Sequence, residues 1–228
     1  MRRESSTVIA LVGGVSGGLL AGLAESPNVA VVRPPAPGQD TQSGLPRSPA
    51  PAQPGATRAA PESPRPGWEQ GALAMHAAAR RPATYVVVPA DPLAGVAAAW
   101  RAMWDVAAGQ ESAAGFEEAA LESLLAWRAK RFELPDYYLV IAPPEDTATG
   151  PDLYLGPMRA ARPHRVAVAA IAGQDETAGS WGLASAISLL DTLRSLPHGP
   201  WWPPLDELLD GARHFYAGGL AETQQTPV

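Results

Sequence analysis

The chain has 228 residues, of which 46% are apolar, and a net charge of −6 at pH 7. A chain of this length and apolar content can bury a core of its own. Its negative charge offers no basic field to a nucleic-acid backbone, so nucleic-acid binding is not expected. Cysteine is absent, which excludes disulfide bonds, thiol catalysis and thiolate metal sites.

The first 32 residues are apolar after a short charged start, and residues 7–24 carry no charge. Eighteen uncharged residues preceded by Arg2 and Arg3 are long enough to cross a bilayer. Small residues recur in this run every four positions, which permits close helix packing in lipid. We therefore expect residues 1–32 to be an anchor or export signal, and the protein to be membrane-anchored or exported.

The same stretch also fits a strand, a glycine turn, a helix and a second strand, as in a βαβ unit of a cytoplasmic protein. Gly14, Ser16 and Gly18 match G-x-S-x-G, and this short stretch resembles the nucleophile elbow of serine hydrolases. The resemblance implies a soluble α/β hydrolase with Ser16 as its nucleophile. A dinucleotide fingerprint fails at Val15, and a Walker A loop fails because no lysine precedes Lys130.

Residues 33–67 consist mainly of Pro, Ala, Gly, Ser and Gln. They offer almost no large apolar side chain for burial, and their prolines oppose both helix and sheet. We expect a disordered linker here, then a folded domain over residues 68–221 and a disordered tail over 222–228.

Strands and helices alternate within the expected domain. Strands are predicted at 83–90, 136–144 and 164–173, and helices at 91–109, 115–132 and 175–196, with a last short helix after the prolines near residue 200. This alternation predicts an α/β fold with a small mixed or mostly parallel sheet flanked by helices.

Basic residues gather just ahead of the last predicted strand, at Arg159, Arg162, His164 and Arg165. Guanidinium groups in such a loop are suited to holding a carboxylate or phosphate, so these four residues are candidates for anion binding. The alternative is a solvated loop whose arginine stems cover apolar surface.

Trp201 and Trp202 lie side by side in a proline-rich loop, PHGPWWPPLD. Two adjacent indoles there are candidates for a partner-binding hot spot or a lid over a pocket. The alternative is a clamp that packs the last helix onto the domain.

Catalytic candidates are few. They are Ser16, His214 with Asp210 one turn before it, and Asp91 at the end of a strand. Asp91 also reads as a helix N-cap because Pro92 follows it. The four histidines show no metal-ligand spacing, so neither a metal nor a cofactor is expected.

Two functions follow from these patterns. The first is an interaction module, membrane-anchored through residues 7–24 or exported, which binds a protein partner through the tryptophan or arginine loop. The alternative is a soluble α/β enzyme that uses Ser16 and His214. The second requires residues 7–13 and 28–32 to join the same sheet as the later strands.

Overall fold

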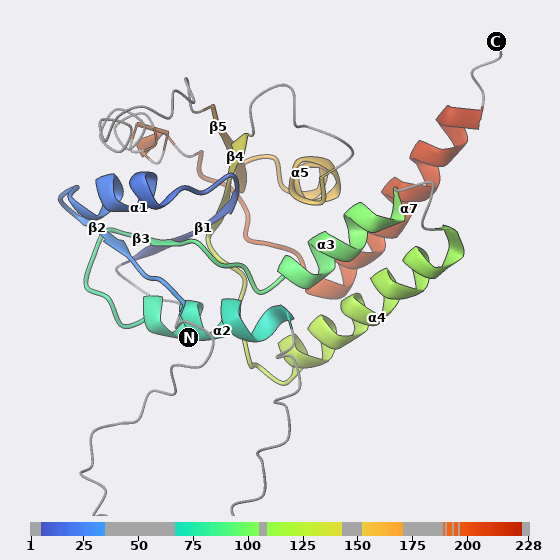
Figure 1. The fold of residues 1–228 in the computed structure, drawn as a ribbon, viewed down its shortest axis with the longest axis horizontal. Helices are drawn as coiled ribbons and strands as arrows, with labels where there is room; N and C mark the ends of the chain where they lie inside the picture. The colour runs from blue at the N-terminus through green and yellow to red at the C-terminus, as the bar shows by residue number, and fades with distance from the viewer. Residues whose placement is uncertain are drawn as a thin grey trace, which may run out of the picture.

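The computed structural model describes residues 6–34, 67–104, 109–142, 152–170 and 197–224, with a few single residues between 189 and 195. These residues form a five-stranded sheet with helices on both faces (Figure 1). The strands are β1 (Thr7–Gly13), β2 (Val29–Val31), β3 (Tyr85–Val88), β4 (Tyr137–Ala142) and β5 (Val166–Ala170). The helices are α1 (Gly17–Ala24), α2 (Gly67–Ala78), α3 (Ala94–Met103), α4 (Gly109–Arg128), the π-helical turn η2 (Tyr154–Met158), α5 (Arg159–Ala161) and α7 (Leu205–Gln224).

The sheet has the order β2-β3-β1-β4-β5, and every strand pair is parallel. The predicted α/β class is therefore confirmed. β1 is the central strand, with Ile9 opposite Val87 of β3 on one side and Tyr137 of β4 on the other. Five of its seven residues are buried, as expected for a strand covered on both faces.

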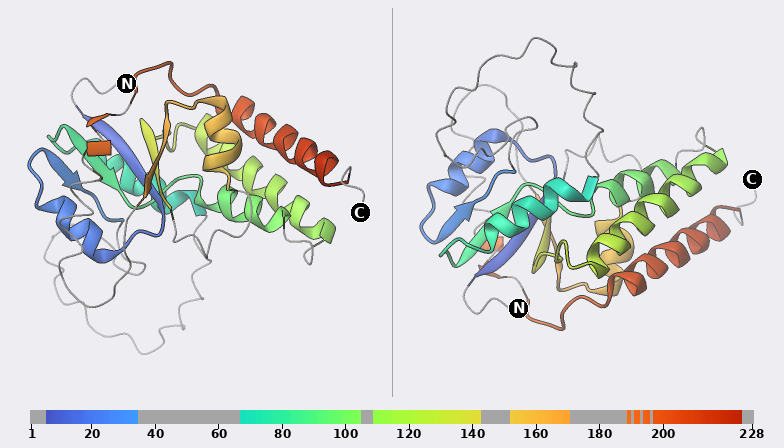
Figure 2. Two further views of the ribbon diagram at one scale, coloured as in Figure 1. Left: turned by 90° about the horizontal axis from the view of Figure 1, so that it is seen from above. Right: turned by 90° about the horizontal axis from the view of Figure 1, so that it is seen from below.

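Alternation along β1 divides the core between two layers. Ile9 and Leu11 face α1 and pack with its leucines. Val8 faces α2, whereas Ala10 and Val12 face the layer made by α3, α4 and α7. Figure 2 shows α3, α4 and α7 grouped at one end of the molecule and α1 with β2 at the other. Because side chains alternate along a strand, β1 packs against apolar residues on both faces of the sheet.

The N-terminal segment adopts the second of its two predicted arrangements. Residues 7–24 form a strand, a turn and a helix rather than one continuous apolar helix, and β2 follows them into the same sheet. The physical reason is pairing, since β1 finds hydrogen-bonding neighbours on both sides. The sheet draws strands from both sides of residue 68, as the alternative of a βαβ unit in residues 1–32 expects.

Among the helices of the described residues, none combines the length and apolar character needed to cross a bilayer. The location of the protein stays a prediction. Residues 35–66, which hold nearly all of the expected linker, lie outside the described residues, as do most of the helix expected at 175–196.

Helix α2 was not expected, because its small side chains show little apolar periodicity. It packs closely on the turn after β3, where a Cβ on Gly71 would lie 2.2 Å from the Pro92 nitrogen. The last helix, α7, is longer than expected and continues to Gln224, past the predicted end of the domain.

β1 ends in a glycine whose conformation the fold requires. Gly13 has φ of +97°, and a Cβ there would lie 2.4 Å from the Ile141 carbonyl oxygen of β4. The chain leaves β1 toward β2 and leaves β4 toward β5, so the connections diverge between these two neighbours. Ligands of open α/β sheets commonly bind at such a point. Residues 143–151, which follow β4, lie outside the described residues.

Candidate binding site at the amino edge of the sheet

Ser16 does not have the geometry of a nucleophile elbow. It has φ −89° and ψ 154°, an extended conformation, and its Oγ accepts a hydrogen bond from the Leu19 N–H at 3.2 Å. Ser16 is therefore the N-cap of α1, which satisfies one of the free amides of that helix. The G-x-S-x-G match arises from a helix start, and the strained backbone of an elbow is absent at this residue.

His214 does not complete a catalytic pair with Ser16. It lies on α7, and Figures 1 and 2 place α1 and α7 at opposite ends of the molecule. Its Nδ1 lies 2.8 Å from the backbone carbonyl oxygen of Asp210, whereas the Asp210 carboxylate pairs with Arg213. The predicted Ser16–His214 arrangement is thus wrong.

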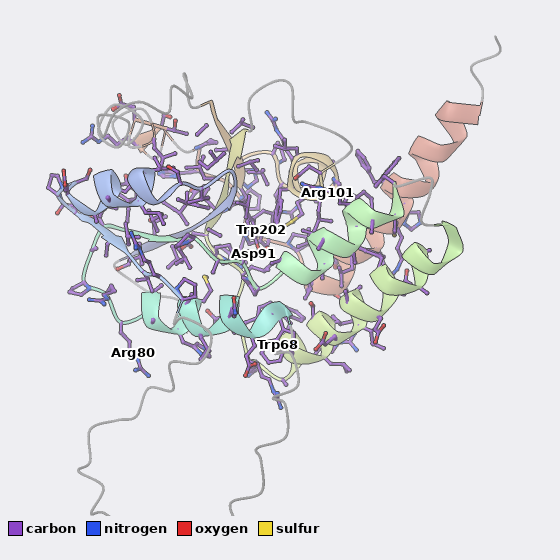
Figure 3. All side chains as sticks on the ribbon, in the orientation of Figure 1. Trp68, Arg80, Asp91, Arg101 and Trp202 are labelled. Carbon is purple, nitrogen blue, oxygen red and sulfur yellow. The ribbon has the colours of Figure 1, made fainter. Side chains whose placement is uncertain are left out.

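Asp91 is buried beneath two tyrosines. Its carboxylate accepts hydrogen bonds from the Tyr138 hydroxyl of β4, at 2.8 Å, and from the Tyr154 hydroxyl of η2. The carboxylate also accepts a hydrogen bond from the Leu93 N–H. Asp91 therefore stabilises the turn before α3, although the helix begins at Ala94 and Leu93 is its N-cap residue. Burial raises the pKa of Asp91, and the three hydrogen bonds oppose that effect. Figure 3 shows Asp91 near the centre of the molecule.

The two tyrosines remain protonated because burial and the nearby Asp91 raise their pKa values well above the usual range. Tyr138 also packs edge-on against the Trp202 ring, with centroids 5.7 Å apart. The carboxylate joins the end of β3 to β4 and η2, and Tyr138 extends the group to the loop before α7 through Trp202. Only 5% of Asp91 is exposed, so these contacts lie inside the core.

The arginine loop and the tryptophan loop contact each other, which the sequence did not predict. Three of the four basic residues bind backbone carbonyls of the tryptophan loop. Arg162 Nε donates to the Trp201 carbonyl at 2.8 Å, and Arg165 donates to the Gly199 and Pro200 carbonyls at 2.7 and 3.1 Å. His164 Nε2 lies 2.8 Å from the Pro200 carbonyl oxygen, whereas Arg159 is exposed on α5 and takes no part.

Arg165 therefore acts as a clamp rather than as a docking point for an anion. Its third hydrogen bond, from Nη1, reaches the Asp136 carbonyl at 3.2 Å, and the side chain is only 7% exposed. The guanidinium lies over the Tyr137 and Trp201 rings, 4.9 and 5.0 Å from their centroids. Such stacking with several donors at fixed angles is specific to arginine.

The adjacent indoles separate into two roles. Trp202 is buried in the core, and its Nε1 donates to the Pro135 carbonyl at 2.8 Å. It therefore fits the alternative interpretation, in which the tryptophan packs the last helix onto the domain. Trp201 keeps 42% of its surface exposed, under Arg165. Gly199 permits this close loop, because a Cβ there would lie 2.4 Å from the His164 ring.

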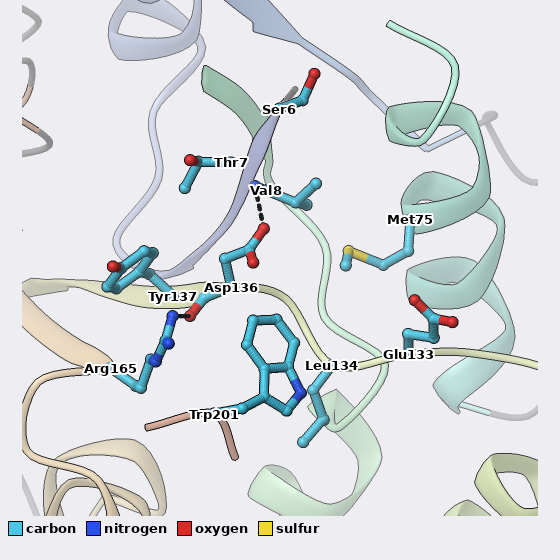
Figure 4. A pocket seen from close by; sticks show the side chains of 10 residues that line it. All are labelled: Ser6, Thr7, Val8, Met75, Glu133, Leu134, Asp136, Tyr137, Arg165 and Trp201. Carbon is cyan, nitrogen blue, oxygen red and sulfur yellow. Dashed lines mark hydrogen bonds between the residues drawn. The ribbon is translucent and has the colours of Figure 1, made fainter. Parts of the chain in front are cut away.

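Trp201 stands at a pocket of about 200 Å³ at the amino ends of β1 and β4 (Figure 4). The pocket is lined by Ser6, Thr7, Val8, Met75, Glu133, Leu134, Asp136, Tyr137, Arg165 and Trp201. Asp136 connects the two strands that form it, because its carboxylate accepts the Val8 N–H at 2.6 Å. Sequence patterns pointed to the arginine and tryptophan of this site but gave no signal for the residues from β1 and α2.

Replacing Arg165 tests the clamp. We expect Arg165→Met to lower the free energy of unfolding by about 2 kcal/mol, because three carbonyls lose a charged donor while the stem is kept. Arg165→Lys should recover less than half of the loss, since one ammonium cannot reach all three oxygens. Urea unfolding followed by circular dichroism measures both, and a lysine variant as stable as the wild type would contradict the clamp.

No family model, no curated protein and no solved structure matches the chain, so its geometry alone bears on its function.

Proposed function

We propose that this protein is an interaction module that binds a short segment of a protein partner in the amino-edge pocket. The pocket would accept one apolar side chain with a basic residue beside it. The observation that carries this proposal is Trp201, a large aromatic side chain held exposed by an arginine that is itself buried. Tryptophan and arginine are both enriched among interaction hot spots.

The size of the pocket favours a side chain over a free metabolite. Small-molecule sites commonly span roughly 300 to 1,000 Å³, and this pocket is smaller. Val8, Met75, Leu134 and Trp201 supply the apolar part of its wall, and the rest of the wall is polar. An aliphatic side chain could therefore be enclosed while its own backbone stays outside.

The charges at the pocket favour a basic neighbour. Glu133 is exposed and Asp136 is half-buried, and both line the pocket. Arg165, the one cation among the lining residues that the structure describes, is directed to three carbonyls and two rings. The whole chain is also acidic, which favours encounter with a basic partner.

Two capped dipeptides test the proposal, N-acetyl-Leu-Arg-amide and N-acetyl-Leu-Glu-amide. With 5-fluorotryptophan in the protein and Trp201→Phe to assign its ¹⁹F resonance, we expect the Leu-Arg peptide to shift the Trp201 signal with a Kd on the order of 1 mM, as for a single anchored side chain. The Leu-Glu peptide should bind at least about threefold more weakly.

Charge reversal gives the control. Glu133→Lys should exchange the preference between the two peptides, whereas Glu25→Lys, at the exposed C-cap of α1, should leave it unchanged. A Trp201 signal that does not move, or that moves equally with both peptides, would rule out this site as the contact.

A further inference from the structure

Helix α4 presents two leucines to solvent on its outer face. Leu121 and Leu125 are each 57% exposed, more than any other large apolar side chain of the described residues. They lie one turn apart and form a single stripe, while Phe116, Ala120 and Ala126 of the same helix face the core. Figure 2 shows α4 at the outer surface of the helical layer beside α7.

Hollows flank this stripe on both sides. Leu121 borders one of about 280 Å³ between α4 and α7, which Leu209 also lines. Leu125 borders another of about 340 Å³, against Trp68. The surface is therefore ridged and hollowed, a shape that can receive apolar side chains from a second helix.

Two exposed charges that bracket the stripe are opposite in sign, and Glu122 lies exposed between them. Glu118 is exposed one turn before Leu121, and Arg128 is exposed one turn after Leu125. If a second α4 is laid antiparallel about a two-fold axis near position 123, Leu121 meets Leu125 of the other copy. In the same register Glu118 meets Arg128, and symmetry repeats both contacts.

We propose that two copies of this chain associate through α4 in this antiparallel register. Arg128 is already extended toward α7 by its ion pair with Asp206, 3.3 Å long, and 58% of its side chain stays exposed to accept a second carboxylate. Two leucines and one ion pair from each copy make a small contact, so the dimer is a weak one.

Charge exchange across the two-fold axis tests the register. By sedimentation equilibrium over about 5 to 500 µM, we expect a reversible monomer–dimer equilibrium. Glu118→Arg and Arg128→Glu should each raise the dissociation constant about tenfold, because symmetry places two like-charged pairs in contact. The double variant should return to within about threefold of the wild type, and Arg101→Glu, on α3, should change nothing.

Cysteine exchange gives a second readout, since the chain has no cysteine of its own. Mixing a Leu121→Cys chain with a Leu125→Cys chain should form a disulfide between copies faster than either chain forms alone. A chain that stays monomeric throughout, a double variant no better than the singles, or faster pairing of Leu121→Cys with itself would overturn the proposal. A monomeric Leu125→Cys chain whose introduced thiol resists a thiol reagent would overturn it too, because the chain would then cover this face itself.

Discussion

A chain shortened to residues 68–228 is expected not to fold. Removing residues 1–67 deletes β1, the central strand, together with β2. β3 and β4 then lose the partner that each of them pairs with, and the apolar side chains packed on β1 in both layers lose their neighbours. The loss of a central strand exceeds the total stability of an ordinary domain, roughly 5 to 15 kcal/mol.

Far-ultraviolet circular dichroism and urea unfolding measure this result. If residues 1–32 were only an anchor or a signal, the shortened chain would unfold cooperatively with the stability of the full chain, and that outcome would refute the sheet order. A matched pair tests the same point in the full chain. Ile9, which is fully buried, should tolerate Val at a cost of about 1 kcal/mol, whereas Ile9→Asp should unfold the protein.

The difficulty in predicting the N-terminal segment has a physical origin. A run of small and apolar residues satisfies both a helix in lipid and a strand, turn and helix in water. What decides between them is long-range pairing, such as the approach of Gly13 to the Ile141 carbonyl, which local pattern does not contain. The later strands were predicted correctly because β-branched and aromatic residues mark buried parallel strands wherever they pair.

The candidate site was predicted in its parts but not in its assembly. The sequence predicted Arg165 as an anion-binding residue before a strand, and Trp201 as a partner-binding residue in a proline-rich loop. The bond from Arg165 to the Pro200 carbonyl joins residues 35 positions apart in the chain, and no motif spacing encodes such a contact. For the same reason Asp91 was noticed, whereas the two tyrosines that bind it were not.

Removing the carboxylate of Asp91 should be the most damaging single truncation among the polar residues of the core. Asp91→Ala leaves two buried tyrosine hydroxyls and the Leu93 N–H without a hydrogen-bond acceptor. We therefore expect the free energy of unfolding to fall by about 3 kcal/mol or more. Asp91→Asn should lose less, because its amide keeps one acceptor oxygen for a tyrosine. Tyr154→Phe serves as the control that removes one donor and leaves the carboxylate in place.

The pH dependence separates the two forces that act on this carboxylate. Burial raises its pKa above 3.8, so the folded state binds the proton more tightly than the unfolded chain. Its stabilising contribution is then complete below pH 3.8 and declines as the pH rises through the folded pKa. The stability of the wild type relative to Asp91→Asn should therefore decrease between about pH 4 and neutrality, measured by urea unfolding at each pH. A relative stability that rises over this range would mean that the tyrosine hydroxyls, by stabilising the charged form, outweigh burial.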